Sequence, residues 1–129
     1  MNNKKITKIF IKTKTKNYNV IIGENILKNV NKYFNCNRNV LIITDKNIPK
    51  IYIDVVKNKC KNPYIYKIKQ GEDSKNFFNV KKILKFLLKN NFSRSDAIIA
   101  IGGGVVGDLS AFVASTMRFT AMQPIRFII

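Results

Sequence analysis

The spacing of apolar residues along this chain predicts short strands that alternate with helices. The middle of residues 6–14 alternates between apolar and polar side chains, and residues 18–22 form a second strand, so the N-terminus is predicted to be an antiparallel hairpin. Three further strands are predicted at residues 39–44, 64–68 and 97–101. The first and last of these are continuous apolar runs, which are typical of strands buried on both faces.

Apolar residues at helical spacing follow the hairpin and each of the three later strands. The predicted helices are residues 26–34, 48–59, 77–89 and 105–115. Asn25 and Asn76 are the predicted N-caps of the first and third helices. The predicted apolar stripes include Phe77 and Leu88 on the third helix and Phe112 on the fourth.

This order of elements indicates an α/β fold, a Rossmann-like and mostly parallel sheet with helices on both faces, preceded by the antiparallel hairpin. Right-handed crossovers join parallel strands of this kind. We expect the strand at residues 97–101 to be central, with the strands at residues 39–44 and 64–68 beside it. No linker or repeat divides the chain, so a single domain is expected over residues 1–129.

A glycine turn separates the strand at residues 97–101 from the helix that follows it. Three consecutive glycines, at positions 102 to 104, permit positive φ and a close approach of a ligand to the backbone. The helix that follows directs its free N–H groups and the positive end of its dipole to the same point. A phosphate or pyrophosphate is therefore the expected ligand, although the GxGxxG spacing by itself is a weak signal.

Polar clusters follow all three predicted parallel strands. Asp45 and Asn47 follow the first, Glu72 and Lys75 the second, and the glycine turn with Asp108 the third. Each cluster alone is equally typical of a turn or a solvated loop. Because the carboxyl ends of parallel strands share one edge of a sheet, where α/β proteins bind ligands, the three together indicate a site.

Composition narrows the functional classes less than the motifs do. The formal charge of +17 could indicate a nucleic-acid partner, but the lysines are spread over nearly every segment, so we expect none. Cys36 and Cys60 form no CxxC pair, and no histidine is present to complete a zinc site. Isolated cysteines and a polar N-terminus predict a cytoplasmic protein with no membrane partner.

Residues 100–109, AIGGGVVGDL, resemble the signature of the 3-dehydroquinate synthase family, enzymes of the shikimate pathway of aromatic amino acid biosynthesis. The segments TDKNI at residues 44–48 and GEDSK at residues 71–75 are similar to two nucleotide-contacting loops of that family, and they occur in the same order. The resemblance runs from about residue 18 to residue 116. A sibling sugar-phosphate cyclase and a glycerol-dehydrogenase-like enzyme share the scaffold and stay open as alternatives.

The resemblance implies a set of NAD contacts. They are Asp45, Asn47, Glu72 and Lys75 on the adenosine side, Gly103, Gly104 and Val105 at the pyrophosphate, and Asp108 at a ribose hydroxyl. The alternative for Asp108 is stabilisation of the helix dipole from the first turn, worth about 0.3–1 kcal/mol. Arg118 is similar to a substrate-phosphate arginine if residues 119–124 are an insertion before a strand at residues 125–128.

The family converts 3-deoxy-arabino-heptulosonate 7-phosphate to 3-dehydroquinate, with transient oxidation by NAD and elimination of phosphate. It is homodimeric and uses a divalent metal, zinc or cobalt, held by a glutamate and two histidines of a C-terminal domain. We therefore expect a truncated chain, the NAD-binding N-terminal part, without metal ligands or catalytic residues and inactive alone. The alternative from a different class is a basic, non-enzymatic binding module.

Overall fold

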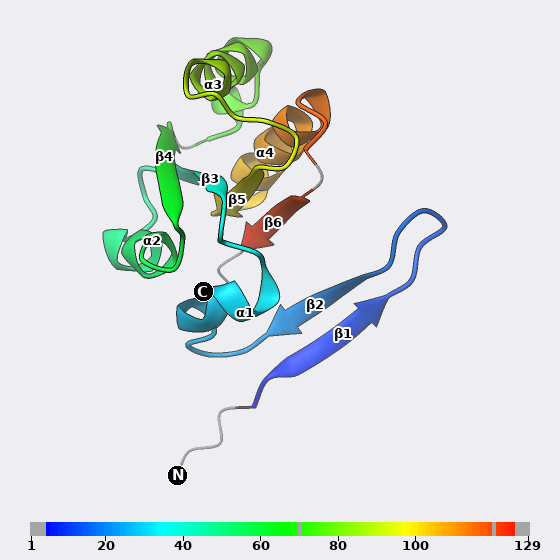
Figure 1. Cartoon of the computed structure of the whole chain (residues 1–129). Helices are drawn as coiled ribbons and strands as arrows, with labels where there is room; N and C mark the ends of the chain where they lie inside the picture. Colours follow the sequence, from blue (N-terminus) through cyan, green and yellow to red (C-terminus); the bar gives the residue numbers. More distant parts are fainter. Residues whose placement is uncertain (1–4, 70, 120, 126–129) are drawn as a thin grey trace.

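The computed structural model describes residues 5–69, 71–119 and 121–125 (Figure 1). In chain order the elements are β1 (Thr7–Ile11), β2 (Tyr18–Ile22), the 3-10 turn η1 (Leu27–Asn29), α1 (Val30–Tyr33), β3 (Asn39–Asp45), α2 (Lys50–Lys57), β4 (Asn62–Ile68), the 3-10 turn η2 (Glu72–Ser74), α3 (Phe77–Lys89), β5 (Ala97–Ile101), α4 (Gly104–Thr116) and β6 (Ala121–Ile125). Within these ranges no helix is both long and apolar enough to cross a membrane.

Four parallel strands form the main sheet in the order β4-β3-β5-β6. The predicted interior position of β5 is confirmed, since β3 and β6 flank it. The prediction that β4 also lies beside β5 is wrong, because β3 pairs with both and separates them. Residues 40–44 of β3 are 0% exposed. A strand this apolar is better buried in the interior of the sheet, between two neighbouring strands, than at its edge.

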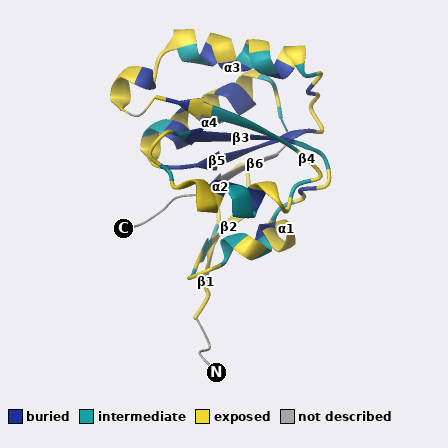
Figure 2. Cartoon of the chain, turned by 90° about the vertical axis from the view of Figure 1, so that its left-hand side faces the viewer, coloured by how far each residue is buried: buried dark blue, intermediate teal, exposed yellow. Residues whose placement is uncertain are grey.

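Helices cover both faces of this sheet and make three layers (Figure 2). Leu41 and Ile43 of β3 pack with α3 and α4 on one face, whereas Val40 and Ile42 pack with α1 and α2 on the other. This alternation is the period of two of an extended strand. Each buried isoleucine or leucine stabilises the fold by about 1.5–3 kcal/mol, so the sheet is the rigid base of its loops.

The β1–β2 hairpin is a separate two-stranded sheet and projects away from the three layers (Figure 1). Its antiparallel pairing, with Ile9 opposite Val20, confirms the predicted hairpin. Both of these residues and Phe10 are exposed. A hairpin without a covered face is marginally stable in water, so this one contributes little to the core.

Two local predictions about the first helix and the last strand need correction. The helix expected at residues 26–34 is only η1 followed by one turn, α1, and Asn25 has φ 55° and caps neither. A left-handed residue cannot occupy the extended conformation of an N-cap. The last strand, β6, spans Ala121–Ile125 and shares only Ile125 with the strand expected at residues 125–128, of which residues 126–128 lie outside the described part.

The third helix is as predicted at both ends, but its apolar stripe is not. The Asn76 side chain accepts a hydrogen bond from the Asn79 N–H at 2.9 Å, which confirms the predicted N-cap. Phe77 and Leu88 are 79% and 64% exposed, and Phe112 on α4 is 50% exposed. These three predicted core positions are wrong, because the helices bury narrower faces than their apolar residues span.

Candidate functional site

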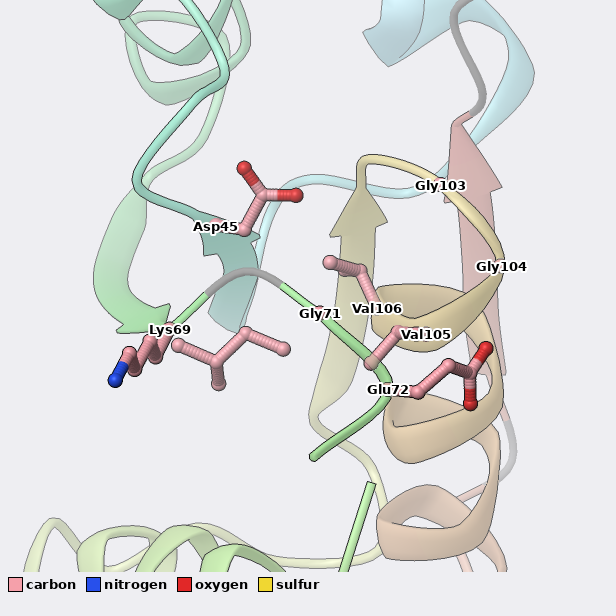
Figure 3. A pocket seen from close by; sticks show the side chains of 9 residues that line it. Asp45, Lys69, Gly71, Glu72, Gly103, Gly104, Val105 and Val106 are labelled. Carbon is pink, nitrogen blue, oxygen red and sulfur yellow. The ribbon is translucent and has the colours of Figure 1, made fainter. Parts of the chain in front are cut away.

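An open pocket of about 270 Å³ lies at the carboxyl edge of the main sheet (Figure 3). Residues at and just after the carboxyl ends of β3, β4 and β5 surround it, as expected for strands that end at one edge of a parallel sheet. The lining residues are Asp45, Ile68, Lys69, Gly71, Glu72, Gly103, Gly104, Val105 and Val106.

The three consecutive glycines at this edge have different structural reasons to be glycine. Gly102 has φ 155°, and a Cβ there would lie 2.9 Å from Cγ2 of Val106, so the turn itself requires glycine. Gly103 and Gly104 have no heavy atom within 4 Å of the position of a Cβ. Nothing in the described fold fills the space above these two residues, which face the pocket.

The N-terminus of α4 is directed at the same pocket. The Gly107 N–H donates to the Gly103 carbonyl at 3.1 Å and closes the first helical turn. The N–H groups of Gly104, Val105 and Val106 precede this bond and lack an intrahelical acceptor. Backbone donors and the positive helix end therefore face open space, an arrangement that suits an anionic ligand.

Asp45, the last residue of β3, lines the pocket (Figure 3). Its Oδ1 atom accepts the Asn47 N–H at 2.8 Å, and its carbonyl accepts the Ile48 N–H at 3.3 Å. Asp45 therefore stabilises a turn, which was the alternative to a ligand contact, and it also lines the pocket. Asn47 is exposed and is not among the lining residues.

The loop after β4 is held in place by hydrogen bonds within the chain. Ser74 is 5% exposed and its hydroxyl donates to the Lys69 carbonyl, while the Lys75 N–H donates to the Glu72 carbonyl at 2.9 Å. Figure 3 shows the Glu72 side chain beside the first turn of α4. The loop thus presents a carboxylate to the pocket from a fixed backbone.

An ion pair joins this loop to α4, and the sequence patterns did not indicate it. Lys75 Nζ lies 2.8 Å from Asp108 Oδ2, with the two side chains 47% and 53% exposed. The hydrogen bond to Asp108 is the main cause that raises the pKa of Lys75. Neither residue lines the pocket.

Asp108 is the fifth residue of α4 and lies beyond its first turn. The alternative role predicted for it, stabilisation of the helix dipole from the first turn, is therefore wrong.

Some residues that line the pocket were not predicted from the sequence, and one residue that was predicted, Arg118, lies elsewhere. Ile68, the last residue of β4, and Lys69, which follows it, line the pocket, and their place at the end of a strand was the signal that could have found them. Arg118 follows the other end of α4, a helix of 13 residues and so about 20 Å long, and has φ 54°. It lies away from the pocket, and its role toward substrate stays a prediction.

Metal-binding residues do not converge in the part of the chain that the structure describes. Residues 5–69 and 71–119 contain no group of three or more His, Cys, Asp or Glu side chains that could hold a metal ion. The described residues therefore do not fit a divalent metal, and no chemical step is assigned to one here.

The sequence of the chain is similar to those of known proteins. Residues 65–127 match a family model described as 3-dehydroquinate synthase N-terminal. The 3-dehydroquinate synthases of Pelagibacter ubique and of Buchnera aphidicola subsp. Cinara cedri are each 40% identical, over 119 and 124 residues. Each alignment covers 88% of this chain and 32% of the relative, so the chain spans about a third of the curated relatives' length.

A solved structure shares the fold over nearly the whole chain. It is 2-deoxy-scyllo-inosose synthase complexed with carbaglucose-6-phosphate, NAD⁺ and Co²⁺, with a TM-score of 0.84 and 22% identity over 93% of this chain and 35% of that one. An identity this low supports the Rossmann-like fold alone. The sequence matches, in contrast, confirm the predicted resemblance to 3-dehydroquinate synthases.

Proposed function

We propose that this chain, which resembles the N-terminal part of 3-dehydroquinate synthases, is the NAD-binding part of such an enzyme. The proposal depends mainly on the empty space above Gly103 and Gly104 at the N-terminus of α4. Neither glycine is required by the described packing, and the space adjoins free helix N–H groups. A pyrophosphate needs both features, because its oxygens must approach the backbone closely.

The polar residues around the pocket suit the remainder of the dinucleotide. Glu72 and Asp45 present carboxylates that can accept both hydroxyls of a ribose. Asn47 and Lys75 extend the adenosine side, and Asp108 is assigned a ribose hydroxyl. Bound NAD would supply a hydride acceptor, while these residues bind and orient it.

The activity of the longer relatives is proposed for the whole enzyme and not for this chain alone. That activity is the NAD-dependent conversion of 3-deoxy-arabino-heptulosonate 7-phosphate to 3-dehydroquinate with loss of phosphate, a lyase reaction. The described residues gather no metal ligands and the chain spans about a third of its relatives, so we expect no turnover by this chain. Phosphate release measured with the purified chain and added Zn²⁺ or Co²⁺ tests this, and metal-dependent release would contradict it.

The NAD assignment is tested by titrating NAD into the labelled chain and following backbone amide shifts by NMR. An open pocket buries little of the ligand, so we expect an affinity of about 1 mM, or about −4 kcal/mol. Shifts should concentrate at residues 71–75 and 103–108. Gly104→Val should abolish them, because its side chain enters the empty space, while the fold is unchanged by circular dichroism.

Ala111→Val is the matched control, since it adds the same branched side chain at an exposed position of the same helix, away from the pocket. This variant should bind NAD like the parent. If Gly104→Val also binds like the parent, the glycine turn is not the cofactor site. Binding that falls linearly with the logarithm of salt concentration and shows no preference for NAD would favour the basic binding module instead.

A further inference from the structure

The two cysteines of the chain meet at the edge of the sheet opposite to the candidate pocket. Cys36 lies between α1 and β3, and Cys60 lies between α2 and β4, so both precede the amino ends of parallel strands. The Lys61 N–H donates to the Cys36 carbonyl at 3.1 Å and holds the two segments together. Twenty-three residues separate the cysteines in sequence, but their segments are neighbours in the fold.

Both thiols are packed against the same apolar cluster and are reachable from the same hollow. Cys36 is 4% exposed and belongs to the cluster beneath β3 and β5, against which Cys60 packs. A second open pocket, of about 370 Å³, is lined by both cysteines. The Cys60 thiol donates to the Val56 carbonyl at 3.4 Å, within the segment that the Lys61–Cys36 backbone hydrogen bond joins to Cys36.

We propose that Cys36 and Cys60 are a redox-sensitive dithiol, which a low-molecular-weight disulfide converts to an intramolecular disulfide. The partly exposed Cys60 sulfur attacks one sulfur of the reagent, and the S–S bond of the reagent breaks to release one thiol. The Cys36 sulfur then attacks Cys60, forms the protein S–S bond and releases the second thiol. The protein loses two electrons and two protons, and the reagent gains both.

The chemistry of these thiols makes the reaction slow at neutral pH. Burial raises the pKa of Cys60 to about 12, with the neighbouring Cys36 as the next cause, and burial also raises the pKa of Cys36. The thiolate is the nucleophile, so the rate should increase as the pH rises toward these values. The dithiol is thus suited to slow oxidation rather than to rapid catalytic exchange.

The resulting bond would close a loop from residue 36 to residue 60 that contains β3 and α2. A disulfide that closes a loop of about this length stabilises a folded chain mainly by restricting its unfolded state. The candidate pocket lies at the other end of β3, and neither cysteine lines it. The proposal therefore stands independently of the NAD assignment.

The test incubates the whole chain, natively folded, with oxidised glutathione at pH 7 and pH 9, then measures intact mass. We expect the mass of two hydrogen atoms to be lost, faster at pH 9, with a peptide map that links residues 36 and 60. The melting temperature should rise by about 5 °C or more and return after reduction by dithiothreitol.

Cys36→Ser and Cys60→Ser are the matched controls. Neither can form the internal bond, so each should gain at most one glutathione and show no such rise in melting temperature. An unchanged mass of the parent after oxidation at pH 9 would overturn the proposal. Glutathione adducts or linked dimers of the parent, without the internal bond, would overturn it equally, since they show that the thiols cannot join.

Discussion

The two ends of the parallel strands use their polar residues in opposite ways. At the amino end, Asp96 is 7% exposed and accepts hydrogen bonds from the Ser93 N–H at 2.8 Å and from Asn39 Nδ2 at 3.5 Å. At the carboxyl end, Gly103 and Gly104 are exposed, with nothing described within 4 Å of a Cβ position. Asp96 is satisfied by hydrogen bonds within the chain, whereas the glycine turn presents its backbone to a pocket.

This contrast separates structural residues from candidate ligand contacts without reference to any relative. A buried polar group that loses its partner destabilises the fold, whereas an exposed backbone donor already exchanges bonds with water. Substitution of a buried, hydrogen-bonded residue such as Asp96 should therefore change stability alone. At the carboxyl end the effect should depend on whether the residue supports the turn or faces the pocket.

The largest effect is expected for Asp96→Ala at the amino end. Three donors lose a charged acceptor, Ser93 N–H, Ser93 Oγ and Asn39 Nδ2, so the free energy of unfolding should fall by about 1.5–3 kcal/mol. Urea denaturation measures it, with exposed Asp73→Ala as the control. If the two variants were equally stable, the structural role of the amino end would be refuted.

Next in size is Gly102→Ala, which tests the supporting part of the glycine turn. Alanine at this position would have to adopt a φ of 155°, and its Cβ would lie 2.9 Å from Cγ2 of Val106. The free energy of unfolding should therefore fall by about 1–3 kcal/mol. Gly103→Ala is the matched control and should unfold at nearly the parent's urea concentration, since its Cβ meets nothing. If both variants lost the same stability, the two glycines would not differ in their structural role in the turn.

A smaller effect is expected for Asn76→Ala, which removes the N-cap of α3. The side chain accepts the Asn79 N–H and donates to the Asp73 carbonyl at 2.6 Å, so about 1 kcal/mol of stability should be lost. Thermal unfolding followed by circular dichroism measures the loss. Asn76→Asp keeps the capping oxygen and should restore most of it; failure to do so would argue against the cap.

The smallest effect on folding is expected for Lys75→Met, which breaks the exposed pair with Asp108. Exposed ion pairs contribute little, so the melting temperature should stay within error of the parent, while NAD-induced shifts weaken. The pKa of Lys75 is raised above its ordinary 10.5. The ammonium group therefore stays charged and paired with Asp108 below pH 10.5, and the pair is lost only as the pH rises through the raised pKa. Affinity for NAD should therefore be the same at pH 6.5 and 8.5. A pH-dependent affinity in that range, or a marked loss of stability, would contradict this assignment.

Local patterns in the sequence determined the elements and the motif. The apolar run of β5, the glycines after it and the cap at Asn76 each depend on neighbours within a few residues, and all were found where predicted. The expectation that three loops share one edge also held for Asp45, Glu72 and the glycine turn. It held because parallel pairing brings the carboxyl ends of strands together whatever their order.

Only the tertiary structure decided which distant residues meet. The separation of β4 from β5 by β3, the Lys75–Asp108 pair across 33 positions and the meeting of Cys36 with Cys60 have no local signal. Phe77 was expected in the core, yet it forms an exposed edge-to-face pair with Phe112, ring centroids 6.0 Å apart. Helical spacing shows which residues share a side of a helix, but only packing against the sheet selects how much of that side is buried.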